Sequence, residues 1–387
     1  MSGPPGFGNS LLEAVYDGAL WAWTTCANTG LLGSGSNSQN VDIGGTQYRV
    51  IRHLGEGGFS IVLLVENVDT GEQYALKKMM CQQGTDMLEM AQREIDAYQR
   101  FHHPNIISLV GHSVEPADSM PGGSVVCMVF PLYRLGNLMD IVAHSQENSA
   151  PLSESFIIDM FRGICSAVQH LHSYGSKRDG IGSIAGYNPP QETSASSGTN
   201  NRVVEEEEHF LTESGLENGQ MQPVTAATGG PYVHRDLKLA NVMVTDDLCT
   251  PILMDFGSVA RARITAETRI DALRIQDDAA ENCTMPYRAP ELFDVHTGVE
   301  LDERTDIWSL GCLLFALTYG YTPFEDPQNG PGASIALAAI NASYRYPKNS
   351  PYSDRIPRLI DAMLVPDPQE RPFIGQVIEL VDELYSL

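Results

Sequence analysis

The sequence predicts an α+β fold with two lobes, a β-rich N-terminal lobe that contains one main helix and a mostly helical C-terminal lobe. Short β-branched and apolar runs separated by turn residues fill positions 48–131, and one helical stretch interrupts them. Beyond residue 138 the apolar residues recur at the three- and four-residue spacing of helices. We place the first lobe at 46–133 and the second at 134–387.

The composition excludes several classes of protein. The chain has 387 residues and a net charge of −25, which argues against a nucleic-acid-binding protein, because such a surface needs Lys and Arg to displace counterions from phosphate. Its seven cysteines include no CxxC pair, so we expect neither a zinc site nor a disulfide framework, and a reducing compartment fits. No run reaches the roughly 18–20 apolar residues of a membrane-spanning helix.

Two segments are expected to lie outside the folded lobes. Residues 1–45 are poor in charge and end in a run of Gly, Ser and Asn at 33–40, which predicts an N-terminal extension with a flexible linker. Residues from about 176 to 230 are rich in small polar residues and include four consecutive glutamates at 205–208. This composition predicts a low-complexity acidic insertion within the second lobe.

The secondary structure of each lobe follows from the spacing of apolar residues. The expected strands are Tyr48–Leu54, Ile61–Val68, Gln73–Met80, Ile107–Val110 and Val125–Pro131. The expected helices are Met87–Phe101 in the first lobe and Ser153–Ser173, Asp306–Tyr319 and Phe373–Tyr385 in the second. Residues 266–281 have a helix-forming composition, with apolar residues among charged ones.

A glycine-rich turn joins the first two strands. The run Gly55-Glu-Gly-Gly-Phe-Ser-Ile-Val62 fits the pattern GxGxFxxV, in which glycines let the backbone approach the phosphates of a nucleotide. A hairpin turn without a ligand can have the same pattern, so the run does not decide alone. Lys77 follows on the third strand in an AxK sequence, which favours it over its neighbour Lys78 as the contact to the α- and β-phosphates.

The expected partner of Lys77 is an acid on the helix that follows. Glu94 is placed to fill this role, and Glu89 remains an alternative on the same helix. A glutamate on a helix is most often merely solvated, so the pairing depends on the other motifs.

The strongest pattern is the run HRDLKLAN at 234–241, followed fourteen residues after its end by the sequence DFG at 255–257. Phosphoryl transfer needs an acceptor for a hydroxyl proton, a cation at the transferred phosphate and oxygen ligands for Mg²⁺. Asp236, Lys238 and the pair Asn241 and Asp255 supply these in turn. A polar loop with incidental charges is the alternative, but the order and spacing of both motifs disfavour it.

Three further motifs follow in the second lobe. The run TMPYRAPE at 284–291 is expected to seat a peptide substrate, and DIW at 306–308 and Arg371-Pro372 complete the set.

Together these motifs resemble those of eukaryotic protein kinases, from about residue 48 to 387 apart from the insertion. Lys238 and Thr284 are similar to the residues of the serine/threonine classes rather than to those of tyrosine kinases. The stretches 272–293 and 302–306 resemble the Numb-associated kinase family, within it the myristoylated-and-palmitoylated branch and its fungal vacuolar relatives.

The resemblance implies a serine/threonine protein kinase that transfers the γ-phosphoryl group of ATP, with Mg²⁺, to protein substrates. The residues it implies at the nucleotide are Leu54, Gly55, Glu56, Gly57, Gly58, Phe59, Ser60, Val62, Ala75, Lys77, Phe130, Leu132 and Met243. Of these, Val62, Ala75 and Met243 would surround the adenine, and Leu132 would lie in the hinge. Phe130 stands at the gatekeeper position. Glu291 would form a buried ion pair with Arg371.

Relatives in this branch act on Golgi, endosomal or vacuolar membranes, which they reach through lipid anchors. This sequence opens Met1-Ser2-Gly3, so removal of the initiator exposes serine instead of the glycine that N-myristoylation requires. Cys26 alone is available nearby for palmitoylation, and one acyl chain anchors a protein only marginally. We expect a cytoplasmic protein, and peripheral attachment to such a membrane stays open.

Two other functions compete with this interpretation. A catalytically inactive pseudokinase scaffold would be expected to lack one of Lys77, Asp236, Asn241 and Asp255, and all four are present. A kinase of small molecules would not need the segment 284–291, which resembles the peptide-seating segment of protein kinases.

Overall fold

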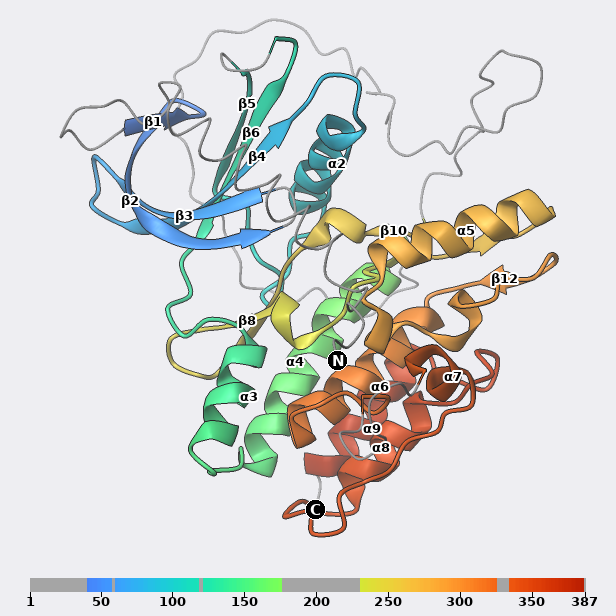
Figure 1. Cartoon of the computed structure of the whole chain (residues 1–387). Helices are drawn as coiled ribbons and strands as arrows, with labels where there is room; N and C mark the ends of the chain where they lie inside the picture. Colours follow the sequence, from blue (N-terminus) through green and yellow to red (C-terminus); the bar gives the residue numbers. More distant parts are fainter. Residues whose placement is uncertain (1–39, 58–59, 118–120, 176–229, 326–333, 386–387) are drawn as a thin grey trace, which may run out of the picture.

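The structure is a computed structural model, and it describes residues 40–57, 60–117, 121–175, 230–325 and 334–385. These residues form a β-rich N-terminal lobe and a mostly helical C-terminal lobe, as predicted (Figure 1). The predicted acidic insertion and nearly all of the predicted N-terminal extension lie outside the described residues. No helix within the described ranges has both the length and the apolar character needed to cross a membrane.

The N-terminal lobe is an antiparallel sheet with the strand order β1-β2-β3-β4-β6-β5. Its strands are β1 Asn40–Ile43, β2 Thr46–Gly57, β3 Ser60–Asn67, β4 Gln73–Cys81, β5 Gly111–Pro116 and β6 Ser124–Pro131. Helix α2, Met87–Arg100, packs on this sheet through a buried stripe that includes Ala91, Ile95 and Tyr98, at the spacing of one helix face. The predicted strands at 48–54, 61–68, 73–80 and 125–131 and the predicted helix are confirmed.

Two boundaries in this lobe differ from the sequence-based expectation. The strand predicted at Ile107–Val110 is wrong: the strand is β5, and the N–H of Ile107 donates to Leu253 of the other lobe at 2.9 Å. The apolar side chain of Ile107 belongs to the core between the lobes, where it is 4% exposed. The end of the predicted linker is also wrong, because β1 pairs with β2 through a turn at Gly44 and Gly45, both with positive φ. The sheet therefore begins at residue 40.

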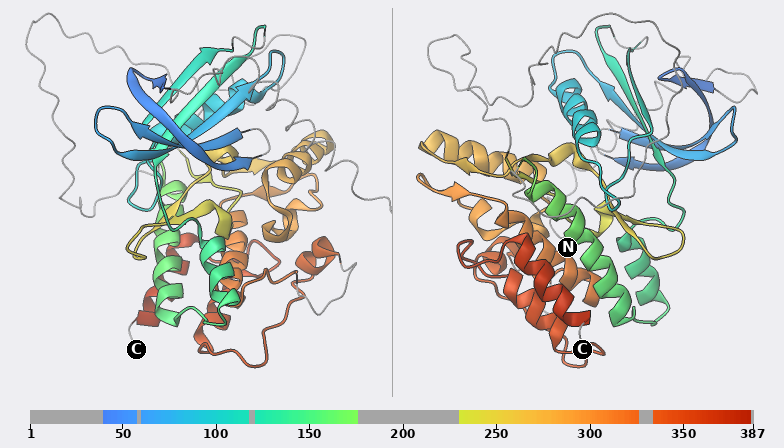
Figure 2. Two further views of the ribbon diagram at one scale, coloured as in Figure 1. Left: turned by 60° about the vertical axis from the view of Figure 1, so that its left-hand side comes forward. Right: turned by 180° about the vertical axis from the view of Figure 1, so that it is seen from behind.

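The C-terminal lobe consists mostly of helices (Figure 2). They are α3 Leu138–Glu147, α4 Glu154–His172, α5 Arg269–Asn282, α6 Arg304–Tyr319, α7 Ile335–Ile340, α8 Arg355–Met363 and α9 Ile374–Tyr385. Helix α6 is buried on nearly every side, and α4 packs against both α6 and α9. The predicted helices at 153–173, 266–281, 306–319 and 373–385 are therefore confirmed.

Short strands and single helical turns connect these helices and carry the polar motifs. The strands are β7 Tyr232–Val233, β8 Val242–Val244, β9 Pro251–Leu253, β10 Ala260–Arg261, β11 Ile264–Thr265 and β12 Glu300–Leu301. The 3-10 turns are η1 Leu239–Asn241, η2 Phe256–Ser258, η3 Met285–Tyr287 and η4 Pro290–Leu292. Several of these turns contact the helices, as η1 does with α3 and α6.

The expected ion pair of Glu291 and Arg371 is present in this lobe. The guanidinium of Arg371 donates to both carboxylate oxygens of Glu291 at 2.8 and 2.7 Å, and its side chain is fully buried. It also donates to the backbone carbonyls of Arg304, Val365 and Pro366. These bonds tie the end of the 284–291 segment to the start of α6 and to the loop before α9.

Replacing Arg371 by alanine is expected to lower the free energy of unfolding by about 3–5 kcal/mol, because Glu291 would remain as a buried charge without its partner. Chemical denaturation measures the change. The control is Arg134→Ala, because the pair of Arg134 and Asp246 is exposed, with 66% and 48% of the side chains accessible, and such pairs contribute roughly 0–1 kcal/mol. Equal losses in the two variants would contradict this account.

Candidate active site

Lys77 on β4 and Glu94 on α2 form a direct ion pair. The Lys77 Nζ donates to both carboxylate oxygens of Glu94, at 2.7 and 2.8 Å, and lies 3.9 Å from Oδ1 of Asp255. Burial disfavours the charged ammonium, but the carboxylates of Glu94 and Asp255 outweigh it and hold the pKa of Lys77 above its ordinary value. Lys77 is therefore a fixed cation on the sheet, next to a carboxylate of the other lobe.

Lys78 and Glu89, the alternatives to Lys77 and Glu94, lie outside this ion pair. Lys78 follows Lys77 directly on β4, so its side chain leaves the opposite face of the sheet. Glu89 is exposed and lies 3.5 Å from Arg93 on the same helix. Neither residue joins the pair.

Tyr98 links this pair to the DFG segment. Its hydroxyl donates to Oε1 of Glu94 at 3.2 Å and accepts the backbone N–H groups of Asp255 and Phe256 at 3.1 and 3.3 Å. Burial and the nearby Glu94 and Asp255 carboxylates raise its pKa well above the ordinary value, so it remains a donor. The sequence analysis missed Tyr98, although its position four residues after Glu94 puts both on one face of α2.

Of the side chains predicted to surround the adenine, Val62 and Ala75 share one face of the sheet with Lys77. Val62 lies opposite Lys77 in the β3–β4 register, and Ala75 lies opposite Phe130 in the β4–β6 register. Because side chains alternate along a strand, all four project from the same face. Met243 is the middle residue of β8 in the other lobe.

The structure places the residues on both sides of the glycine-rich turn between β2 and β3. The residues placed there are Leu54, Gly55, Glu56 and Gly57 at the end of β2 and Ser60 at the start of β3. Gly57 pairs with Ser60 across the hairpin, while Gly58 and Phe59 lie outside the described residues. Leu132 follows β6 directly, on the connection that leads to the second lobe.

A buried carboxylate holds the loop 234–241 in place. Asp306 on α6 is fully buried and accepts the N–H groups of His234 and Arg235 at 2.8 and 3.0 Å, and it lies 3.0 Å from Nε2 of His172. Burial alone would raise the pKa of Asp306, but the hydrogen bond with His172 and the charges of His172 and His234 outweigh it and lower the pKa. Arg235 has a φ of 70°, a left-handed conformation that non-glycine residues rarely adopt. The carboxylate therefore stabilises a strained loop.

Asp236 lies at the centre of a network of donors. Its Oδ2 accepts from Lys238 Nζ at 2.7 Å and from Asn241 Nδ2 at 3.0 Å. Its Oδ1 accepts from the hydroxyl and backbone N–H of Thr284 at 2.6 and 3.2 Å. Burial acts to raise the pKa of Asp236, but the bonds from Lys238 and Thr284 outweigh it and lower the pKa. The residue is thus an ionised carboxylate that can accept a proton.

Asn241 and Asp255 are the two residues predicted to bind Mg²⁺, and they lie on neighbouring segments. The backbone carbonyl of Asn241 accepts the N–H of Met254 at 2.9 Å, and Asp255 is the next residue along the chain. The Asn241 Nδ2 donates to Asp236, so its amide oxygen remains for another partner, and the Asp255 side chain is 42% exposed. Within the described residues, no cluster of three or more His, Cys, Asp or Glu side chains has a geometry that could hold a metal ion. One carboxylate and one amide suit Mg²⁺, which takes its remaining ligands from water and substrate phosphates.

The protein kinase domain family matches residues 48–177 and 230–381, on both sides of the predicted insertion. The chain belongs to this family. It is 32% identical to serine/threonine-protein kinase ppk13 of Schizosaccharomyces pombe, over 88% of this chain and 92% of that protein. Human serine/threonine-protein kinase 16 is also 32% identical, over 89% and 92% of the two chains.

Serine/threonine-protein kinase ENV7 of Saccharomyces cerevisiae is 29% identical to this kinase, over 90% of this chain and 95% of that protein. The predicted resemblance to serine/threonine protein kinases is therefore confirmed. The site described above is the part of the kinase in which its two lobes meet.

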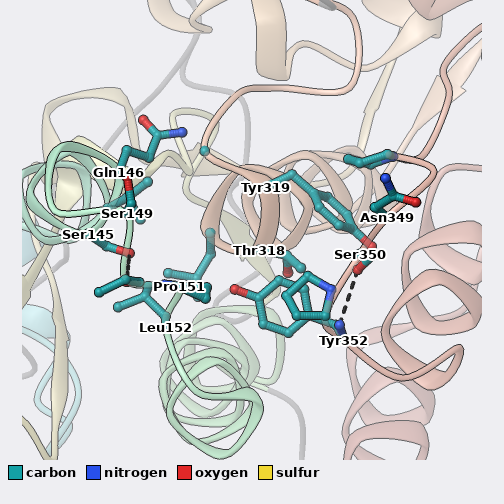
Figure 3. Close-up of a pocket in the computed structure, with 16 residues that line it drawn as sticks. Ser145, Gln146, Ser149, Pro151, Leu152, Thr318, Tyr319, Asn349, Ser350 and Tyr352 are labelled. Atoms are coloured by element: carbon teal, nitrogen blue, oxygen red, sulfur yellow. Dashed lines mark hydrogen bonds between the residues drawn. The ribbon is translucent and has the colours of Figure 1, made fainter.

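A pocket of about 320 Å³ lies elsewhere on the kinase (Figure 3). It is lined by α3, the connection from α3 to α4, the end of α6, and residues 347 and 349–352. Backbone and hydroxyl groups of its own loops pair there, as between Ser145 and Ala150 and between Tyr352 and Ser350. None of the residues of the candidate active site lines it.

Replacing Asp236 by asparagine is expected to lower kcat by about 10²–10⁴-fold, the usual effect of removing a positioned proton acceptor. Nucleotide binding should persist, because Lys77 and Glu94 are untouched. Steady-state kinetics and a nucleotide titration measure the two effects. The exposed turn residue Asp69 provides the control, since Asp69→Asn should leave both unchanged, and near wild-type turnover by Asp236→Asn would show that the assignment is wrong.

The Thr284 hydroxyl should control the pH dependence of the reaction. Thr284→Ala removes a donor to the ionised Asp236, so the pKa of that carboxyl should rise and the acid limb of kcat/KM should move to higher pH. Activity at neutral pH should also fall, roughly 10- to 100-fold, because the Asp236 carboxylate loses a bond that orients it and a shift of about 1 Å at a reacting group can reduce a rate roughly 10²-fold. Thr284→Ser retains the hydroxyl and should keep the wild-type profile. An acid limb that stays in place in Thr284→Ala would contradict this role.

Proposed function

We propose that the kinase transfers the γ-phosphoryl group of ATP, with Mg²⁺, to serine and threonine hydroxyls of protein substrates. The observation that carries this proposal is the contact of Asp236 with both Lys238 and Thr284, which places a proton acceptor and a cation within one hydrogen-bonded network. Lys238 Nζ also donates to the Thr284 hydroxyl at 2.9 Å. The relatives named as serine/threonine-protein kinases support the same substrate class.

Each residue has a separate task in the proposed reaction. Lys77, held by Glu94, binds the α- and β-phosphates and orients the nucleotide. Asp236 accepts the proton of the attacking hydroxyl, and Lys238 balances the charge of the transferred phosphoryl group. Asn241 and Asp255 would hold Mg²⁺, which when bound neutralises negative charge on the phosphates.

Two alternatives are less well supported. A pseudokinase scaffold would not need an ionised Asp236 with its partners in place. A small-molecule kinase would not need Thr284 and the segment after it to lie against the proton acceptor, where a peptide would be seated.

The test of this proposal is transfer of radiolabel from the γ-position of ATP to a generic protein substrate, followed by analysis of the phosphorylated amino acids. We expect label on serine and threonine that disappears with a magnesium chelator and in Asp255→Asn. An aminoglycoside and choline offered in parallel should remain unlabelled. Label on either small molecule, or chelator-insensitive transfer, would contradict the proposal.

We also propose that the kinase acts in the cytoplasm and serves membrane traffic at Golgi, endosomal or vacuolar membranes as a peripheral protein. The support is the resemblance of residues 272–293 to the branch of kinases that act there. Fractionation of cells that express the full chain tests this. Recovery in the cytosolic fraction alone, with no effect of a kinase-inactive variant on traffic, would contradict it.

A further inference from the structure

The guanidinium of Arg235 joins three segments of the kinase. Its backbone is held by Asp306, and its Nε donates to the carbonyl of Ser258, directly after the DFG segment. Its Nη1 is bonded to a carboxylate oxygen of Asp278, in the third turn of α5. The side chain of Arg235 is 21% exposed and that of Asp278 is 48% exposed. The catalytic loop, the DFG segment and α5 are therefore connected through one side chain.

The chain itself supplies the anion for this arginine. In kinases that are ordered by phosphorylation of this segment, a phosphate pairs with arginine and draws the segment into place. Here a carboxylate of α5 binds the arginine that adjoins Asp236. The geometry therefore does not require a phosphate to fix the guanidinium of Arg235.

A second hydrogen bond, within α5, fixes the orientation of the Asp278 carboxylate that binds Arg235. Its other oxygen accepts from Asn282 Nδ2 at 2.9 Å, one helical turn later. Helix α5 begins with a capping box in which Thr268 and Asp271 bond each other's backbone N–H groups, at 2.8 and 3.2 Å. It is fixed on its inner side by Ala272 and other buried residues. Figure 1 shows α5 lying alongside the region where the two lobes meet.

The end of α5 leads directly to the proton acceptor. Cys283 ends the helix, and the hydroxyl of the next residue, Thr284, donates to Asp236. Asp278 is therefore connected to Asp236 by two routes, through Arg235 in the catalytic loop and through the end of α5 to Thr284. A change of position of about 1 Å at a reacting group can reduce a rate roughly 10²-fold.

We propose that Asp278 is a positioning residue for phosphoryl transfer, which acts through Arg235 to hold the catalytic loop and the DFG segment in register. It touches neither substrate nor reacting atoms. The inference rests on the proposed ATP-dependent reaction. The variant Asp277→Asn serves as a matched control for that reaction. Asp277 is an exposed neighbour of Asp278 on α5, and its side chain makes none of these contacts.

The experiment compares phosphatase-treated Asp278→Asn, Asp278→Glu and Asp277→Asn with the wild type. For Asp278→Asn we expect kcat to fall roughly 10- to 10²-fold, with KM for ATP changed less than about twofold, since the pair of Lys77 and Glu94 is untouched. Asp278→Glu retains the charge and should restore most of kcat. Asp277→Asn makes the same change in net charge and should behave as the wild type.

The outcomes separate the possible failures. Wild-type kcat in Asp278→Asn would overturn the positioning role, and so would an equal loss in Asp277→Asn, which would show that only the charge of α5 matters. A loss in Asp278→Asn that accompanies a large fall in melting temperature and a rise in KM would overturn it as well, because the role would then be structural. Failure of the wild type and Asp277→Asn to transfer phosphate would instead contradict the proposed function.

Discussion

The buried carboxylate of Asp306 is the constraint on which the active site depends. Moving a charge into the interior is costly unless several donors replace the lost water. Asp306 meets this requirement with two backbone N–H groups of the catalytic loop and with His172. The hydrogen bonds that stabilise the charge of Asp306 also fix the backbone of His234 and Arg235. Asp236 follows directly in the chain, so these bonds restrict its position as well. The position of Asp236, the proposed proton acceptor, is thus set from α6, the most buried of the helices that the structure describes.

A second set of contacts joins the two lobes. Tyr98 bonds both the Glu94 carboxylate and the backbone of the DFG segment. The ring of Phe256 is 1% exposed and packs against the rings of Tyr98 and His234, with centroids 5.3 and 5.4 Å apart. Any shift of α2 that broke the pair of Lys77 and Glu94 would therefore also disturb Asp255. Lys77 and Asp255, to which we assign phosphate binding and metal binding, are therefore coupled through Tyr98 as well as by their own approach of 3.9 Å.

The sequence could predict what depends on local pattern. Helices such as α4 and α6 follow from apolar spacing, and residues such as Asp236 and Asp255 follow from short motifs whose chemistry is restrictive. The strand predicted at 107–110 failed because an apolar run does not say which core it enters. Strand β1 was missed because Gly44 and Gly45, which form its hairpin turn, have the composition of a linker. Tyr98 and Asp278 were missed because each also bonds a segment that comes close only after folding, the backbone of Asp255 and Phe256 for Tyr98 and Arg235 for Asp278.

The most direct test of this account is single-turnover phosphoryl transfer by Asp306→Asn, with MgATP bound beforehand and folding verified by near-ultraviolet circular dichroism. Asparagine has nearly the same shape but lacks the charge and one acceptor, so the loop 234–241 should lose its register while the Lys77 site remains. The account predicts nucleotide affinity within about threefold of wild type and a transfer rate constant reduced roughly 10²-fold. A folded variant that transfers phosphate at the wild-type rate would contradict it.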